Sequence, residues 1–428
     1  MALDGLLANR AFRLLFTGRC VSLLGDGVFL VALAWQAYTL SNAPTALSLL
    51  GIAMTVPLIA LLLFGGVVSD RHRRRRVMLL ADLVRAALLA TLAMLAATGT
   101  LRLWQMAIIV AIYGGAQAFF DPASDAILPE IVPAGQLGQA NALEQVVRPL
   151  ALRLAGPALG GVLVGVLGLG AAFAVDAATF VVSAASLWAM SFGAGGAVAR
   201  ALAPAEATAL AQVREGWSYV RRRVWLWGTF ASAGVAYLLF MGPAEVLLPF
   251  MVKHELHGSG VQLGLVLGAG GLGSVAAGLA MTRSGLPTRS MTFIYIVWTL
   301  GTLAVAGYGL ASAVWELMLA SVAFNLLESA GEIVWATIKQ RHVPGHMLGR
   351  VSSLDWLISI GLLPISFALT APLSAAFGVR ATLIGAGVAG ATVTFAGLLL
   401  PGMRAFDRSG AQAARGRISP PPSAAEAA

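Results

Sequence analysis

The residues of this sequence that could do chemistry are ionisable side chains set within long apolar stretches. They are Asp26, Arg153, Glu245, Glu328 and Glu332. Burial favours the neutral form of a carboxylic acid, whereas a neighbouring arginine favours its anion. A carboxylate that moves between these two surroundings can bind and release a proton near neutral pH. These residue types therefore point to reversible proton binding, or to binding of a polar group on a substrate.

Simpler interpretations stay open for some of the charges in the apolar stretches. Glu144 and Arg148 are four residues apart, so they can form a structural ion pair along one face of a helix. Glu332 lies near the end of its stretch, where water can solvate it. Asp176 and Glu316 also lie close to stretch ends, and we interpret them as interfacial.

Twelve apolar stretches position these charges. Each has about 18 residues or more, enough for a helix to cross a hydrocarbon core of about 30 Å. Hydrophobic residues make up 58% of the 428-residue chain and charged residues only 11%, whereas a soluble domain has about 25% charged residues. The sequence therefore predicts an all-α membrane protein with twelve transmembrane helices. The predicted spans are 13–38, 44–68, 77–98, 103–121, 140–166, 170–192, 225–251, 261–282, 290–310, 314–338, 350–376 and 379–401.

The distribution of Lys and Arg predicts the orientation of these helices. With the N-terminus in the cytoplasm, 21 of the 28 Lys and Arg residues lie on the cytoplasmic side, three on the opposite side and four within spans. Such an excess is typical of cytoplasmic loops. We therefore expect a multi-pass protein of the cytoplasmic (inner) cell membrane with both termini in the cytoplasm. The basic residues follow the loops and do not form one face of a soluble fold, so no nucleic-acid partner is expected.

Repeated patterns divide the chain into two related halves. The pattern Val-Pro-x-x-x-Leu-Gly begins at Val132 and again at Val343, 211 residues later, and an acid follows each valine by twelve residues. Gly66-x-x-x-Asp-Arg is echoed at Gly278 by Gly-x-x-x-Thr-Arg, 212 residues later. Three matches at nearly one offset predict two pseudo-symmetric six-helix halves, an architecture that places a substrate site between the halves.

These patterns set the expected domain boundaries. Residues 1–192 form the N-terminal half and residues 225–402 the C-terminal half. Residues 193–224 form a cytoplasmic linker, whose end VREGWSYVRRRVW predicts an amphipathic helix on the membrane surface. Residues 403–428 are polar and rich in Pro and Ala, which is typical of a disordered tail.

The loop after the second predicted span holds five arginines within six positions, 71–76. Gly66 just before it would let the second span approach a neighbouring helix closely. Asp70 can begin a tight turn and accept hydrogen bonds from the backbone N–H groups at a helix start.

This loop resembles the signature loop of the major facilitator superfamily. The pattern Gly66-x-x-x-Asp70-Arg71-x-x-Arg74-Arg75 matches it, although the family usually has glycine where this chain has Arg73. The form D-R-x-x-R-R-R-V is similar to that of the drug- and siderophore-efflux branch, which includes enterobactin exporters and macrolide efflux proteins. The resemblance covers essentially the whole chain and implies the major facilitator fold.

The resemblance also implies an inner gate made of Gly66, Asp70, Arg71, Arg74 and Asp121. Arg74 is well placed to pair with Asp70 and with an acid at the inner end of the fourth span, for which Asp121 is the candidate. Such a cluster would close the inner side when the protein faces outward. Arg71, Arg73, Arg75 and Arg76 are expected to contact anionic lipid headgroups. The alternative is that all five arginines only set the membrane topology.

The fifth predicted span contains Gly156-Pro157-Ala158-Leu159-Gly160-Gly161. It resembles the GPxxGG core of the antiporter motif found in exporters of this superfamily. The functional candidates are Gly156, Pro157, Gly160 and Gly161. The alternative is that these small residues serve tight helix packing and that the proline bends the helix. The fourth span carries Tyr113 to Gln117 and no arginine, unlike many proton-coupled exporters.

Together these features predict a secondary active transporter. The expected activity is proton-coupled efflux of a hydrophobic or amphiphilic small molecule, such as a drug, an antibiotic or a siderophore, by alternating access. The expected partners are this substrate, protons and anionic lipids, and the protein is expected to be monomeric. No Walker-type loop and no metal-ligand spacing are present in the sequence, so neither cofactor nor metal is expected. The alternatives are an importer or uniporter of a small metabolite and, more remotely, a membrane enzyme or scaffold.

Overall fold

A computed structural model describes Leu6, residues 8–133, 136–190, 209–284 and 287–404, and residues 406–407. This part of the chain is helical almost throughout and contains no strand. Twelve of its helical segments are long and apolar enough, by length and composition, to cross a membrane. Each overlaps one predicted span, so the predicted all-α fold with twelve transmembrane helices is confirmed. Much of the predicted linker and tail, residues 193–208 and 408–428, lies outside the described residues.

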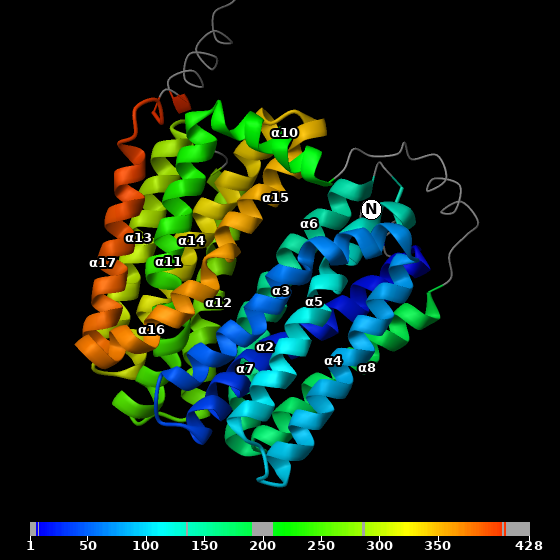
Figure 1. Cartoon of the computed structure of the whole chain (residues 1–428), viewed down its shortest axis with the longest axis vertical. Helices are drawn as coiled ribbons and strands as arrows, with labels where there is room; N and C mark the ends of the chain where they lie inside the picture. Colours follow the sequence, from blue (N-terminus) through cyan, green and yellow to red (C-terminus); the bar gives the residue numbers. More distant parts are fainter. Residues whose placement is uncertain are drawn as a thin grey trace, which may run out of the picture.

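The first six membrane segments form one bundle, drawn in blue through cyan to green in Figure 1. Its first helix begins after Asn9, whose side chain accepts hydrogen bonds from the N–H groups of Ala11 and Phe12, as N-cap residues do. The helices are α2 (Arg10–Leu40), α3 (Thr45–Arg71), α4 (Arg74–Ala97), α5 (Leu103–Ile131), the run of α6 (Leu137–Arg148), η2 (Pro149–Ala155) and α7 (Gly156–Val166), and α8 (Leu169–Ala189).

The last six membrane segments form a second bundle beside the first (Figure 1). They are α11 (Val224–Phe250) with η3 (Met251–Glu255), α12 (Gly260–Ser284), α13 (Ser290–Leu310), α14 (Val314–His342), α15 (Gly345–Gly361) with α16 (Leu363–Phe377), and α17 (Val379–Leu398). The fourth helices of the two bundles, α5 and α14, begin and end 211 residues apart. The sequence repeat therefore has a counterpart in the helix boundaries.

The fifth segment of each bundle is interrupted in the middle. In the first bundle the π-helix η2 begins at Pro149, and in the second bundle α16 begins one residue before Pro364. Proline removes a backbone donor and disturbs the regular helix, and π-helical turns often occur where a helix carries function. The two bundles therefore share a break at corresponding places.

The two bundles meet through α7 and α12, α3 and α16, and α2 and α11. Tyr38 Oη donates a hydrogen bond to the Val246 carbonyl oxygen at 2.6 Å, and Lys253 Nζ donates one to Thr39 Oγ1 at 2.8 Å. These contacts join the ends of α2 and of α11 with η3. The bundles are therefore fastened to each other at the end of the molecule where α2 ends.

The predicted linker contains α10 (Ala209–Arg221). Figure 1 shows this helix lying across the other end of the second bundle, next to α15. Glu215 on α10 and Arg350 on α15 form an ion pair of 2.7 Å. The linker helix is therefore held on the second bundle.

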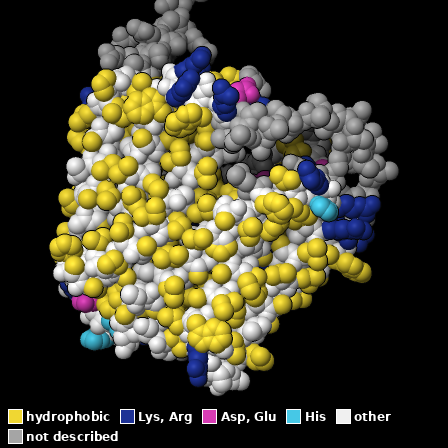
Figure 2. All heavy atoms as spheres, in the orientation of Figure 1, with side chains coloured by type: hydrophobic (Ala, Val, Ile, Leu, Met, Phe, Trp, Pro, Cys, Tyr) yellow, Lys and Arg dark blue, Asp and Glu magenta, His cyan; other side chains and the backbone are white. Residues whose placement is uncertain are grey.

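Hydrophobic side chains cover most of the face shown in Figure 2, whereas Lys and Arg gather toward its ends. Large apolar side chains such as Phe64, Leu80 and Trp188 are more than half exposed. A soluble monomer rarely exposes so much contiguous apolar surface. This distribution suits a protein whose sides face lipid.

Candidate functional site

Asp26 lies in the middle of α2, half-buried, and faces α5. The Tyr113 hydroxyl on α5 donates a hydrogen bond of 2.5 Å to Asp26 Oδ1. The Tyr113 side chain is buried and stacks on Phe29, so its hydroxyl is held in place. The first bundle therefore holds a carboxylate between its first and fourth membrane helices, bound by a tyrosine.

Glu328 has a matching arrangement in the second bundle, where it lies on α14 and is 9% exposed. The Tyr237 hydroxyl on α11 donates a hydrogen bond of 3.0 Å to Glu328 Oε1. Trp298 Nε1 on α13 donates to the backbone carbonyl of Glu328 at 3.3 Å and fixes this turn of α14. Each bundle therefore contains a carboxylate–tyrosine pair between its first and fourth helices.

The remaining predicted coupling residues lie on α11, α14 and η2. Glu245 on α11 and Glu332 on α14 are exposed in the isolated chain, as is Arg153 on η2. Arg153 acts electrostatically on both Glu245 and Glu328, although it belongs to the other bundle. Its backbone carbonyl is packed against Gly271 of α12. Arg153 of the first bundle is therefore close enough to both acids of the second bundle to act on their charge.

The predicted gate residues are only partly as expected. Arg74 pairs with Glu130 at 3.0 Å and also donates to the Ala126 carbonyl. Asp121, the predicted partner of Arg74, instead accepts a hydrogen bond of 3.3 Å from Gln117. The choice of Asp121 as the acid at the inner end of the fourth span was wrong because α5 continues through Pro122 and ends at Ile131. Prolines are tolerated within membrane helices, so the apparent stop at Asp121 was misleading.

Two further gate predictions concern Gly66 and Asp70. A Cβ on Gly66 would meet no atom within 4 Å, whereas a Cβ on Gly65 would collide with the Ala118 backbone carbonyl of α5. The close helix approach assigned to Gly66 therefore belongs to Gly65. The side chain of Asp70 lies outside the described residues. Arg71 is exposed at the end of α3.

The GPALGG segment packs on both of its sides. A Cβ on Gly156 would lie 2.7 Å from Gly27 Cα, and a Cβ on Gly160 would lie 2.8 Å from Val28 Cα, both on α2. A Cβ on Gly161 would lie 2.8 Å from Gly264 Cα on α12. Backbones that approach this closely admit only glycine. Pro157, buried at the start of α7, completes a helix that is wedged between its own bundle and the other one.

Two expected interpretations of buried charges were wrong. Glu144 pairs with Arg19 of α2 at 2.7 Å, rather than with Arg148 one turn away on its own helix. Asp176 is completely buried in α8 rather than interfacial. Both residues point toward α2. The residue pattern along their own helices does not reveal which neighbouring helix they face.

Sequence reasoning missed an ion pair inside the first bundle. Arg85 Nη2 and Asp82 Oδ1, three residues apart on α4, are 2.5 Å apart, and both side chains are buried. The available signal was an acid and an arginine at helical spacing within one apolar span. In the described part of the chain, no group of three or more His, Cys, Asp or Glu residues could hold a metal ion.

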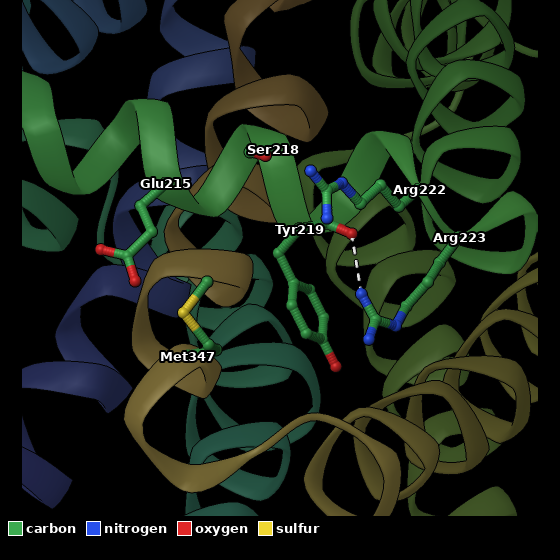
Figure 3. A pocket seen from close by; sticks show the side chains of 6 residues that line it. All are labelled: Glu215, Ser218, Tyr219, Arg222, Arg223 and Met347. Atoms are coloured by element: carbon green, nitrogen blue, oxygen red, sulfur yellow. Dashed lines mark hydrogen bonds between the residues drawn. The ribbon is translucent and has the colours of Figure 1, made fainter.

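A surface cavity lies between α10 and α15, away from the two carboxylate–tyrosine pairs. Figure 3 shows Arg223 folded over the Tyr219 ring, 3.5 Å from its centroid, with Nη1 donating to the Tyr219 carbonyl at 3.1 Å. Arg223 is therefore held against α10 itself. The cavity is lined by Glu215, Ser218, Tyr219, Arg222, Arg223 and Met347.

Two relatives that the chain matches along most of its length are named as efflux proteins. The chain is 27% identical over 398 residues to the multidrug efflux pump Tap of Mycolicibacterium fortuitum, covering 90% of this chain and 94% of that protein. It is 25% identical over 380 residues to macrolide efflux protein A of Streptococcus pyogenes, covering 86% and 90%. An uncharacterized major facilitator-type transporter of Bacillus subtilis, YfiS, is 25% identical over 363 residues, covering 81% and 83%.

Solved structures with the same fold are also transporters. The nucleoside transporter NupG superposes with a TM-score of 0.69 at 12% identity, over 91% of this chain and 98% of that one. A bacterial homologue of the iron transporter ferroportin, in an inward-facing state, superposes with a TM-score of 0.65 at 16% identity, over 91% and 99%. At these identities the likeness concerns the fold.

A family model described as transmembrane secretion effector matches residues 5–426, nearly the whole chain. This match agrees with the twelve membrane helices, the two related bundles and the signature loop between α3 and α4. The chain is a multi-pass membrane transporter that belongs to the transmembrane secretion effector family of the major facilitator superfamily.

Proposed function

We propose that this protein exports a hydrophobic or amphiphilic small molecule in exchange for protons, by alternating access between its two bundles. The observation that carries the proposal is the carboxylate–tyrosine pair in each bundle, Asp26 with Tyr113 and Glu328 with Tyr237. A carboxylate held within a membrane helix is costly to keep charged and is a common carrier of protons in transporters. The printed names of the relatives, a multidrug efflux pump and a macrolide efflux protein, support a drug or antibiotic as substrate. A siderophore would also fit.

Arg153 gives this proposal a means of coupling. It lies on the bent fifth segment of the first bundle yet acts on Glu245 and Glu328 of the second. Alternating access moves the bundles against each other, so the distance between this cation and these carboxylates changes during the cycle. The proton affinity of the carboxylates would change with it, and Glu332, one turn beyond Glu328, would share the same surroundings.

The proposal also assigns the sides of the membrane. The end fastened by Tyr38 and Val246 would face outside, and the end carrying α10 would face the cytoplasm together with both termini, in the cytoplasmic membrane. Arg71, Arg73, Arg75 and Arg76 would then contact anionic lipid headgroups. Gly66, Asp70, Arg71 and Arg74, with Glu130 in place of Asp121, would form the inner gate, and the protein would work as a monomer. The two halves of the transporter would span residues 1–192 and 225–402.

Transport by the purified protein in lipid vesicles tests the proposal. An imposed pH gradient should drive accumulation of a fluorescent drug or a labelled macrolide, and a protonophore should abolish that accumulation. Protons should move in the opposite direction at the same time, which a pH-sensitive dye reports. Accumulation that is insensitive to the pH gradient would reject proton exchange, and net movement in the same direction as the protons would favour an importer.

A further inference from the structure

Three carboxylates and one arginine lie together inside the first bundle. Asp82 and Arg85 lie on α4, Asp176 lies on α8 and Asp26 lies on α2. The side chains of Asp82 and Asp176 are completely buried, and Arg85 is 4% exposed. α8 packs between α4 and α2, so these charges lie inside one bundle rather than in the seam between the two.

Asp82 and Arg85 form an ion pair with each other. Arg85 Nη2 donates to Asp82 Oδ1 at 2.5 Å, and Ser183 Oγ on α8 donates to Asp82 Oδ2 at 2.6 Å. The guanidinium also lies over the rings of Phe120 and Phe180, 4.3 and 4.4 Å from their centroids. Arg85 is thus committed to Asp82, and the pair is neutral as a unit.

Asp176 has no such partner. Its Oδ1 is 3.2 Å from Thr179 Oγ1, but the same hydroxyl is 2.7 Å from the Asp176 backbone carbonyl. One hydroxyl proton cannot serve both acceptors fully. Asp176 Oδ2 is buried and makes no hydrogen bond. As an anion, Asp176 would therefore be buried with at most one shared donor and no cation in contact, which is strongly unfavourable.

The groups facing Asp176 increase this difficulty. Asp26 on α2 repels a negative charge on Asp176, and Arg85 on α4 attracts it. Arg85 is already paired with Asp82. The Gly25 backbone lies directly against the Asp176 carboxyl, because a Cβ there would collide with Oδ1. Asp26 itself is influenced by Arg148 and Asp121 as well as by Arg85.

We propose that Asp176 is a second proton-binding site of the transport cycle, occupied by a proton in this conformation. The proton forms an O–H bond at the Asp176 carboxyl and leaves when a rearrangement brings Arg85 to it, and Asp82 then takes up a proton in its place or turns toward water. Because this inference rests on the proposed proton exchange, it deepens that function: the first bundle binds one proton at Asp26 and another at Asp176.

Protonation of Asp176 can be measured without transport, by infrared spectroscopy of the full chain in lipid at neutral pH. A protonated carboxylic acid has a carbonyl stretching band that a carboxylate lacks, and Asp176→Asn should remove one such band. Asp82→Asn should also weaken that band, since it leaves Arg85 free to pair with Asp176. Ser183→Ala, which removes only a neutral donor to Asp82, is the matched control and should leave the band in place. An unchanged band in Asp176→Asn overturns the inference, whatever the transport assay shows.

The role in the cycle is read from the ratio of protons to substrate. If two protons are exchanged, loss of one lowers the highest attainable accumulation by about tenfold for each unit of pH gradient. Asp176→Asn should show this loss and still accumulate substrate. Thr179→Val, which removes the neighbouring hydroxyl but keeps the acid, should retain the wild-type ratio and provides a second readout if Asp176→Asn folds poorly. A band that disappears with an unchanged ratio would make Asp176 a static protonated residue and would overturn its part in the cycle.

The two proposals fail in distinguishable ways. A wild-type protein that transports without any pH dependence would reject proton exchange and the cycle role of Asp176, even if the infrared band were present. A wild-type protein with proton-driven transport and no Asp176 band would retain the proposed function and reject only this inference.

Discussion

Tyr237 lies 211 residues after Asp26, and the two residues hold equivalent places on the first helices of their bundles. Glu328 likewise lies 211 residues after Gln117 on the fourth helices. In the first bundle the first helix supplies the acid and the fourth helix the tyrosine, whereas in the second bundle these roles are exchanged. The repeat therefore preserves the pairing of an acid with a tyrosine, but not the helix on which each is found. Both pairs join the first and fourth helices of their own bundle.

The tyrosine hydroxyls should matter to the pH dependence of transport. Tyr113→Phe and Tyr237→Phe each remove one hydrogen bond to a carboxylate, worth about 1.5–3 kcal/mol when the acceptor is charged. Each variant should fold and bind substrate but should transport with a changed pH profile. Tyr38→Phe, whose hydroxyl bonds a backbone carbonyl, is the matched control. Equal pH profiles for all three variants would contradict a role for the pairs in proton binding.

Neutral substitutes at the two acids should uncouple transport. Asn at Asp26 and Gln at Glu328 mimic the protonated forms with similar volume, so these variants should lose uphill export yet still bind substrate and exchange it down its gradient. Loss of a proton-binding group should also flatten the dependence of transport on pH. Efflux from vesicles over a range of pH is the measurement.

Full proton-driven accumulation by both Asp26→Asn and Glu328→Gln would eliminate these residues as proton carriers. Glu245 and Glu332 would then be the next candidates. Glu316, at the far end of α14 and bound to Ser312, is a suitable control carboxylate because it lies outside the region between the bundles.

Much of the fold could be predicted from the sequence because its determinants are local. Membrane helices follow from long apolar runs, and the two halves follow from the repeat at Val132 and Val343. The end of α5 could not be found in this way. Asp121 and Pro122 look like a helix end, but the neighbouring helices of a bundle satisfy polar groups and tolerate prolines that would end an isolated helix.

The partners of the site residues were harder to predict because they depend on packing between helices. The pairing of Glu144 with Arg19 and of Arg74 with Glu130 requires knowledge of which helix faces meet. The in-helix pair of Asp82 and Arg85 was visible in the sequence as two charges three residues apart. The isolation of Asp176 was not visible in the sequence, because only the structure shows that no cation contacts its carboxyl group.

The inner gate should depend on Glu130 more than on Asp121. Glu130→Gln removes the charge that Arg74 contacts at 3.0 Å, whereas Asp121→Asn changes a residue whose observed partner is the neutral Gln117. Both members of the ion pair are about one-fifth exposed, so the loss in stability should stay near 1 kcal/mol or less.

The effect on transport should be larger, because the ion pair must form and break in each cycle. Arg74→Ala and Glu130→Gln should lower the rate of efflux by a similar factor while membrane insertion is retained, since four arginines remain in the loop. The double variant should be no worse than either single one. A stronger defect in Asp121→Asn than in Glu130→Gln would restore Asp121 as the partner acid of the gate.

Neighbouring glycines on α3 should respond very differently to alanine. Gly65→Ala places a methyl group against the Ala118 backbone carbonyl, whereas the methyl group of Gly66→Ala meets no atom within 4 Å. Overpacking of this kind costs about 1–3 kcal/mol, so Gly65→Ala should lower the melting temperature of the purified protein and Gly66→Ala should not. Gly278→Ala, at the echo of Gly66 in the second bundle, also meets no atom within 4 Å and is the second control.

If Gly66→Ala left stability unchanged but impaired efflux, the signature glycine would act in the other conformation, where α3 and its loop must contact a different neighbour. Equal destabilisation by Gly65→Ala and Gly66→Ala would contradict the close contact of α3 with α5 at Gly65.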